Sequence, residues 1–171
     1  MFTFASILVK LNQVYLSLGS NVGNRTAMLQ EAISLLSEVG EVEQISSFYE
    51  TAAWGKTEQP AFLNLVLLMQ TNLRAINFMQ ELIAIESRMG RIRNEKWEAR
   101  MIDIDILFFN HEVINEKHLH VPHPFLQQRK FVLEPLAEIA PHFVHPVLKL
   151  EVLQLLKNCA DTLSVNRLAH A

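Results

Sequence analysis

Cysteine is almost absent from the sequence. Cys159 stands alone among 171 residues, so the chain cannot form an internal disulfide, which is typical of a reducing compartment such as the cytoplasm. No apolar run reaches the roughly 18 residues of a membrane span. The formal net charge is only −3, which argues against nucleic-acid binding through bulk positive charge. We therefore expect a cytoplasmic protein whose partners are neither membranes nor nucleic acids.

Internal repeats, domain linkers and low-complexity tracts are also missing from the sequence. Half of the residues are apolar, and a chain of this length can bury a sizeable core. We expect one domain over residues 1–171, in which residues 1–13 form an apolar N-terminal extension of unknown role. No basic residue precedes the apolar run of this extension and no small-residue cleavage site is evident, so we do not expect a signal peptide.

The spacing of apolar residues predicts the order βαββαβ, which is that of a ferredoxin-like antiparallel sheet with both helices on one face. A β-hairpin and two further helices should follow and cover the other face, so the predicted fold class is α+β with α/β/α layers. The last dozen residues carry no usable signal. The expected elements are strands at 14–18, 42–50, 62–70 and 101–109, helices from the turn 19–24 to about 39 and at 75–89, a hairpin of 112–114 with 119–121, and helices at 125–139 and 149–158.

The strand at 101–109 carries two acids on one face. Asp103 and Asp105 alternate with three isoleucines, and a period of two is typical of a strand. The carboxylates are then roughly 7 Å apart, where they repel by roughly 2–3 kcal/mol at an effective dielectric of about 20. Leu107 and Phe109 should continue this face. One interpretation is a strand face turned to water, and the other is a site for a hard cation such as Mg²⁺.

Arginines gather just before these acids. Four of the eight in the chain, Arg88, Arg91, Arg93 and Arg100, lie within thirteen residues. Guanidinium forks match phosphate oxygens, and arginines beside a metal suit a polyphosphate. The segment therefore indicates a metal–phosphate site. Trp97 lies among these charges, so we expect it outside the core, in a loop that closes over a ring.

Other candidate sites are weaker. The turn Gly19-Ser20-Asn21 lacks the Gly-Lys-Ser/Thr ending of a P-loop, so a structural turn is the simpler interpretation. His118 and His120 could share a strand face and bind a transition metal. No cysteine or close carboxylate completes that site, and solvated histidines are the alternative.

Several separated motifs nevertheless follow one another in a specific order, and together they resemble the 6-hydroxymethyl-7,8-dihydropterin pyrophosphokinase family of the folate pathway. The resemblance runs from about residue 14 to 146. The motifs are Gly19-Ser20-Asn21; Ser47-Phe48-Tyr49-Glu50-Thr51 with Gly55, Gln59-Pro60 and Phe62-Leu63-Asn64; Glu86 with Gly90-Arg91-Ile92-Arg93; Trp97, Arg100 and Asp103-Ile104-Asp105-Ile106; Val121-Pro122-His123; and the run from Arg129 to Leu136.

The resemblance implies transfer of a diphosphate from ATP to the pterin hydroxymethyl group, with release of AMP, by a single pyrophosphokinase domain that we expect to be a monomer. It implies two Mg²⁺ ions held by Asp103 and Asp105, and catalytic roles for these acids and for Arg91 and Arg100. The ATP site would comprise Glu86, Arg91, Arg93, Trp97, Arg100, Ile106, His123 and Arg129. The pterin site would comprise Thr51, Trp54, Phe62, Asn64, Trp97, Asp103 and Phe131.

Two other functions are weighed against this one. Glu98 and Ala99 stand where the family commonly has Gly-Pro, and Glu98 adds a negative charge near a polyphosphate. Glu98 is the sole support for one alternative, an inactive relative that keeps only ATP or pterin binding. A ferredoxin-like sheet can also bind RNA. The third strand has none of the expected Lys/Arg-Gly-Phe/Tyr pattern beyond Phe62, which argues against an RNA-binding module.

Overall fold

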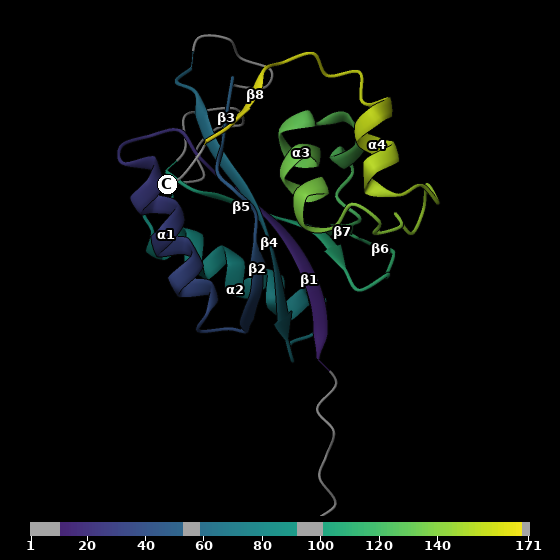
Figure 1. The fold of residues 1–171 in the computed structure, drawn as a ribbon. Helices are drawn as coiled ribbons and strands as arrows, with labels where there is room; N and C mark the ends of the chain where they lie inside the picture. The colour runs from purple at the N-terminus through teal and green to yellow at the C-terminus, as the bar shows by residue number, and fades with distance from the viewer. Residues whose placement is uncertain (1–10, 53–58, 92–100, 169–171) are drawn as a thin grey trace, which may run out of the picture.

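The computed structural model of the chain describes residues 11–52, 59–91 and 101–168. A central antiparallel sheet separates two pairs of helices, as Figure 1 shows. The predicted α+β fold with three layers is confirmed. The elements are β1 (Asn12–Ser20), α1 (Arg25–Leu36), β2 (Glu41–Ile45), β3 (Tyr49–Thr51), β4 (Phe62–Thr71), α2 (Ala75–Arg88), β5 (Asp103–Phe109), β6 (Ile114–Glu116), β7 (Leu119–Val121), the short 3₁₀ turn η1 (Leu126–Gln128), α3 (Lys130–Ile139), α4 (Val152–Asn158) and β8 (Val165–Arg167).

The large sheet has the strand order β5-β1-β4-β3-β8, and β2 also pairs with β4. The single strand predicted at 42–50 is therefore two strands, β2 and β3, on the same neighbour. Between them, the Ser46 hydroxyl accepts the Val66 N–H at 3.0 Å. A side-chain oxygen there takes the place of a backbone carbonyl, as serine commonly does, so the strand is interrupted at this residue.

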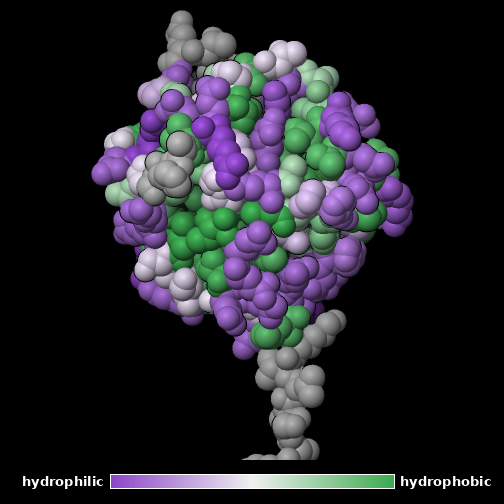
Figure 2. Space-filling model, viewed as in Figure 1, coloured by the Kyte–Doolittle hydropathy of each residue, from purple (hydrophilic) through white to green (hydrophobic). Residues whose placement is uncertain are grey.

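Each face of the sheet has its own apolar core. On one face, side chains of α1 and α2 pack on alternate residues of β4, such as Leu65 and Leu67. On the other face, α3 and α4 pack on the residues in between, such as Val66 and Leu68. The prediction that this strand is buried on both faces is confirmed. On the face of the molecule that Figure 2 shows, polar side chains surround several apolar areas.

Strand β5 contains a bulge that changes the face of its last residues. Tyr15 of β1 lies opposite Phe108, whereas Leu16 lies opposite Ile106, so Leu107 is an extra residue. Leu107 packs in the α3/α4 core, on the acid face as expected. Phe109 packs instead in the α1/α2 core. Its predicted place on the acid face is wrong, because one extra residue inverts the alternation that follows it.

The C-terminal part differs from the prediction in four places. The helix expected at 149–158 is α4, which begins at Val152. Strand β6 begins at Ile114, later than the expected 112, and pairs with β7. The single helix expected at 125–139 is η1 followed by α3, with Arg129 in extended conformation between them. Strand β8 lies in the segment that carried no signal, and it pairs with β3 at the edge of the sheet. Within the described residues, no helix is long and apolar enough to cross a membrane.

Candidate active site

One end of the sheet face that carries α3 is polar. The strand register places Asp103 of β5 opposite Gly19, Gly19 opposite Asn64, and Asn64 opposite Tyr49. Opposed residues of antiparallel strands project to the same face, so Asp103 and Asn64 stand on either side of Gly19. A Cβ at Gly19 would lie 2.6 Å from the Asn64 side-chain oxygen, which no real contact allows. The floor between the two polar side chains is therefore bare backbone.

Glu86 organises the acid side of this floor. It lies near the end of α2 with 3% exposure, and its carboxylate accepts the Ile104 N–H of edge strand β5 at 2.9 Å. Gly90, at φ +83°, ends the helix in the left-handed conformation, and the Arg91 N–H then returns to the Glu86 carbonyl at 3.0 Å. The Arg91 guanidinium forms ion pairs with both Glu86 and Asp103, the latter at 2.8 Å. The arginine is thus held beside the first acid of the pair.

The second acid, Asp105, meets residues that come from the C-terminal part of the chain. His123 and Arg129 each bring a side-chain nitrogen within 3.8 Å of its Oδ2. The His123 N–H donates to the Leu107 carbonyl at 3.1 Å, which fixes the segment after β7 against β5. Arg129 holds its place between η1 and α3. Segments on both sides of β5 in the sequence therefore converge on its two carboxylates.

Burial and neighbouring charges shift the pKa of two members of this group. Desolvation and the neighbouring Asp103 raise the pKa of Asp105 to about 7, although Arg129 opposes the shift. Desolvation and the positive Arg129 lower the pKa of His123 to about 4, so this imidazole is neutral near pH 7. The neutral His123 therefore does not offset the negative charge of Asp103 and Asp105. The side chain of Asp105 remains 40% exposed, so a cation from solution can reach it.

The donor set suits a hard cation that brings other ligands with it. Among residues 11–52, 59–91 and 101–168, no three His, Cys, Asp or Glu side chains group so as to hold a metal ion by themselves. Mg²⁺ is commonly bound by one or two carboxylates, with water and substrate phosphates completing its octahedron. Asp103 and Asp105 fit this requirement, since both are carboxylates on one rigid strand face.

The other side of the floor is neutral. The Asn64 side-chain amide donates to the Thr51 hydroxyl at 2.7 Å, and each of these two residues is 3% exposed. Phe62 lies opposite Thr51 in the strand register and is half-buried. Phe131 lies in the first turn of α3, and the Arg129 guanidinium carbon is 5.8 Å from the centre of its ring. Arg129 thus connects the acid side with the aromatic side.

Several predicted site residues are placed by the structure and others are not. Ile106 is buried in the α1/α2 core, so its side chain points away from the acids. Gly19 and Ser20 continue strand β1, so the turn predicted at 19–24 is confined to 21–24. The Asn21 side-chain amide donates to the Pro60 carbonyl at 3.4 Å. Trp54, Arg93, Trp97 and Arg100, together with Glu98, lie outside the described residues.

Two residues were missed as contributors to the site. The sequence indicates Gly19 only as part of a turn and of a family motif, although its missing side chain leaves room for Asn64. The motif Gly19-Ser20-Asn21 after a strand was the available signal. Phe125 is 47% exposed, and its ring centre is 5.5 Å from the Arg129 guanidinium carbon. An aromatic residue next to the His-Pro pair could have been considered, but nothing local indicates that it faces an arginine.

Comparison with known proteins identifies the family of the chain. The family model for 7,8-dihydro-6-hydroxymethylpterin-pyrophosphokinase (HPPK) matches residues 15–141. A 2-amino-4-hydroxy-6-hydroxymethyldihydropteridine pyrophosphokinase of Aquifex aeolicus is 47% identical over 134 residues, which cover 78% of this chain and 84% of the relative. The protein of the same name from Bacillus subtilis is 42% identical over 130 residues, or 75% of this chain and 78% of the relative.

A solved structure shares the fold. The wild-type Plasmodium falciparum HPPK-DHPS with pteroate superposes with a TM-score of 0.72 at 19% identity, over 87% of this chain and 42% of that chain. At this identity the likeness supports the fold alone, and the chain spans less than half of that longer protein. The sequence matches carry the assignment: the chain belongs to the 7,8-dihydro-6-hydroxymethylpterin-pyrophosphokinase family.

Proposed function

We propose that the polar end of the sheet face under α3 is where this pyrophosphokinase of folate biosynthesis binds both of its substrates. The reaction moves a diphosphate from ATP to the hydroxymethyl group of 6-hydroxymethyl-7,8-dihydropterin and releases AMP. The single observation that carries this proposal is the register row in which Asp103 and Asn64 flank Gly19. A charged subsite and a neutral one share a floor with no side chain between them, as a transfer between a polyphosphate and a flat heterocycle requires.

The charged subsite would bind the triphosphate of ATP. Asp103 and Asp105 would hold two Mg²⁺ ions, which when bound neutralise phosphate charge. Arg91 would offer its guanidinium to a phosphate while Glu86 keeps it oriented, because an arginine held on one side loses little freedom on binding. Arg129 would act from the opposite side of Asp105. His123, being neutral, would contribute a hydrogen bond rather than charge.

The neutral subsite would bind the pterin. Asn64 is fixed by its bond to Thr51, so its amide is presented to the polar edge of a planar ring without a further loss of rotamer freedom. Phe62 and Phe131 come from the sheet and from α3, and both would stack on the ring in an offset arrangement. Positioning of the hydroxymethyl oxygen for attack would supply much of the acceleration. Trp54, Trp97, Arg93 and Arg100 are proposed for the site by family resemblance alone.

Product analysis tests the proposed reaction. The protein is incubated with MgATP with and without 6-hydroxymethyl-7,8-dihydropterin, and the nucleotides are separated. AMP that forms only in the presence of the pterin is the expected result. ADP would mean transfer of a single phosphoryl group, and binding of ATP without any product would mean that the chain is an inactive relative; either outcome contradicts the proposal.

We further expect a monomer that acts as a single domain. The lone Cys159 supports a cytoplasmic location. Light scattering at the enzyme concentration used for the assay would check the first of these points, with a monomer mass as the expected value.

A further inference from the structure

The segment 159–168, here called the C-terminal brace, lies beyond residue 141, where the family match ends. It leaves α4, passes the start of α3 and ends as β8 on the edge of the sheet (Figure 1). We propose that this brace is a positioning element for the pterin, because it fixes α3, which carries Phe131, against β3, which carries Thr51. This inference rests on the proposed pterin subsite.

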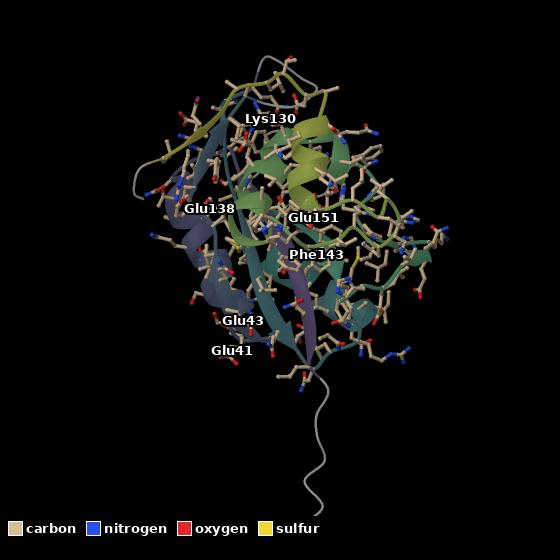
Figure 3. The ribbon with its side chains drawn as sticks, turned by 45° about the vertical axis from the view of Figure 1, so that its right-hand side comes forward. Glu41, Glu43, Lys130, Glu138, Phe143 and Glu151 are labelled. Carbon is tan, nitrogen blue, oxygen red and sulfur yellow. The ribbon has the colours of Figure 1, made fainter. Side chains whose placement is uncertain are left out.

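The first attachment of the brace is at the beginning of α3. Asp161 accepts the Lys130 N–H at 3.1 Å with one carboxylate oxygen and the Leu163 N–H at 3.0 Å with the other. Arg129, at the N-cap position of α3, makes no side-chain cap of its own. The carboxylate of Asp161 therefore satisfies a free backbone donor of the first turn. Lys130, labelled in Figure 3, directly precedes Phe131.

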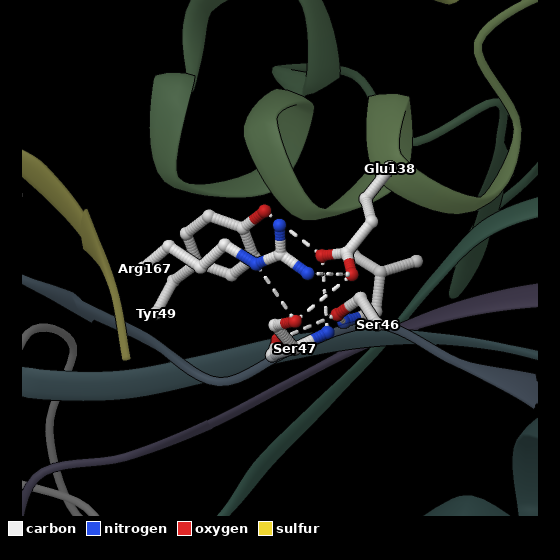
Figure 4. A network of polar contacts seen from close by, with 6 residues as sticks. Ser46, Ser47, Tyr49, Glu138 and Arg167 are labelled. Carbon is white, nitrogen blue, oxygen red and sulfur yellow. Dashed lines mark hydrogen bonds and ion pairs between the residues drawn. The ribbon is translucent and has the colours of Figure 1, made fainter. Parts of the chain in front are cut away.

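The second attachment is at the end of the same helix. Arg167 of the brace donates to Glu138 at 3.0 Å and to the Ser47 hydroxyl at 2.9 Å (Figure 4). Glu138 also accepts the Ser47 N–H at 3.0 Å and the Tyr49 hydroxyl at 2.9 Å. One carboxylate on α3 thus binds β8, β3 and the residues just before β3. We call these four side chains the Glu138 cluster.

The third attachment is the strand pairing itself. Val165 lies opposite Thr51 and Arg167 opposite Tyr49, while the Leu168 N–H donates to the Phe48 carbonyl at 2.8 Å. Strand β3 has only three residues, and without β8 it would be an unprotected edge. The pairing therefore stabilises the strand whose Thr51 hydroxyl holds Asn64.

These attachments act on one side of the site. Glu138 and Phe131 are seven residues apart, so they project from the same face of α3. Tyr49 and Thr51 project from the same face of β3. Holding Glu138 to Tyr49 therefore fixes the distance between Phe131 and the Thr51–Asn64 pair. Strand β5, which carries the acids, lies at the opposite edge of the sheet from β8. Loss of the Glu138 cluster should therefore affect pterin binding more than ATP binding.

Steady-state kinetics of Arg167→Ala and Glu138→Gln in the full chain test this inference. Each variant should raise the KM for the pterin roughly tenfold, since loss of one member of a packed polar network changes distant binding by about this factor. The KM for ATP should change less than twofold. Arg167→Lys, which keeps the charge and loses the fork, should recover part of the pterin affinity. Melting temperatures show that each variant is folded at the assay temperature.

The matched control is Glu38→Gln, which breaks the exposed ion pair between Glu38 and Arg88 at 3.0 Å, remote from the brace. It should leave both KM values unchanged. Equal rises in both KM values of the brace variants, or a lower melting temperature with neither KM altered, would overturn the positioning role. The same shift in the control would overturn it too.

Phe131→Ala distinguishes a failure of the brace proposal from a failure of the proposed pterin subsite. A higher pterin KM in Phe131→Ala, together with unchanged values in Arg167→Ala and Glu138→Gln, would remove the brace from the account and leave the pterin subsite in place. An unchanged pterin KM in Phe131→Ala would instead remove the subsite on which the inference rests.

Discussion

The two faces of the sheet use the same strands for different purposes. Towards α1 and α2, one apolar core covers most of the face, and Ile104 and Leu65 are part of it. Towards α3 and α4, the apolar core stops short, and the neighbouring positions Asp103, Asp105 and Asn64 are polar. The apolar core on one face stabilises the sheet. The opposite face can therefore carry the mutually repelling Asp103 and Asp105, and Gly19, which has no side chain to pack.

The largest expected effect tests the polar face. Asp103→Asn and Asp105→Asn should each lower turnover by at least about a hundredfold, since each removes a carboxylate that would hold the phosphate-bound cation. The fold should persist, because the ionised form of Asp105 is disfavoured at this position and the substitution removes its charge. Turnover and melting temperature are measured for both. Near-normal turnover in either variant would separate the acids from the chemistry.

A substitution on the opposite face should do the reverse. Leu65→Ala opens a cavity in a fully buried part of the α1/α2 core, and should cost about 2–5 kcal/mol of unfolding free energy. Its turnover per folded molecule should stay close to that of the unmodified chain, as urea unfolding and assays below the transition would show. The neighbouring residue Asn64 provides the comparison, because Asn64→Ala should weaken pterin binding. A Leu65→Ala enzyme that is stable but inactive would contradict the division between the faces.

The bare floor gives a third and smaller effect. Gly19→Ala places a methyl group 2.6 Å from the Asn64 oxygen, so this side chain must move. We expect the pterin KM to rise about tenfold, as one misplaced hydrogen-bonding group commonly costs this much. The KM for ATP should change less. Titration of the pterin in the presence of a non-hydrolysable ATP analogue measures the binding directly, and equal affinity in both proteins would show that the floor tolerates a side chain.

The smallest effect concerns pH and the Glu138 cluster. Burial opposes ionisation of Glu138, but hydrogen bonds from Tyr49 and Ser47 and the charge of Arg167 outweigh it and hold the pKa below the ordinary 4.5. A depressed acid pKa stabilises the fold above the ordinary value, and this contribution is lost as the pH falls through the folded-state pKa. Glu138→Gln should therefore cost about 1 kcal/mol at pH 7 and progressively less in acid. Melting curves of the unmodified chain and of Glu138→Gln, recorded at pH 7 and in acid, check this. A stability difference that is the same at both pH values would contradict it.

The main elements could be predicted because their signals are local. Alternating isoleucines and aspartates indicated β5, and the helical spacing of apolar residues indicated α1 and α2. The reversed face of Phe109 could not be predicted, since the bulge depends on how β5 aligns with β1. The division of β2 from β3 has a local cause in the Ser46 hydroxyl, but serine is tolerated in many strands.

The site was predictable in parts. The two acids and the arginines before them indicated phosphate chemistry from their types and spacing alone. Phe131 and Arg129 entered only through the family resemblance, because nothing local shows that a C-terminal helix turns its first residues towards β5. Strand β8 is three residues long and pairs with residues more than a hundred positions away, so no local pattern marks it. Such contacts depend on the assembled sheet.

The most direct test of the account is where the bound metal–nucleotide lies. Mn²⁺ with a non-hydrolysable ATP analogue broadens the NMR signals of nearby amides, so a titration maps the site on the folded chain. We predict that the amide signals of Asp103, Asp105 and Gly19 are lost first, while the signal of Phe78, which packs beside Phe109 at the other end of β5, persists. Glu38 and Glu81 line another pocket, away from Asp103 and Asp105. Broadening centred on that pocket instead would contradict the proposal that one polar sheet face holds the nucleotide.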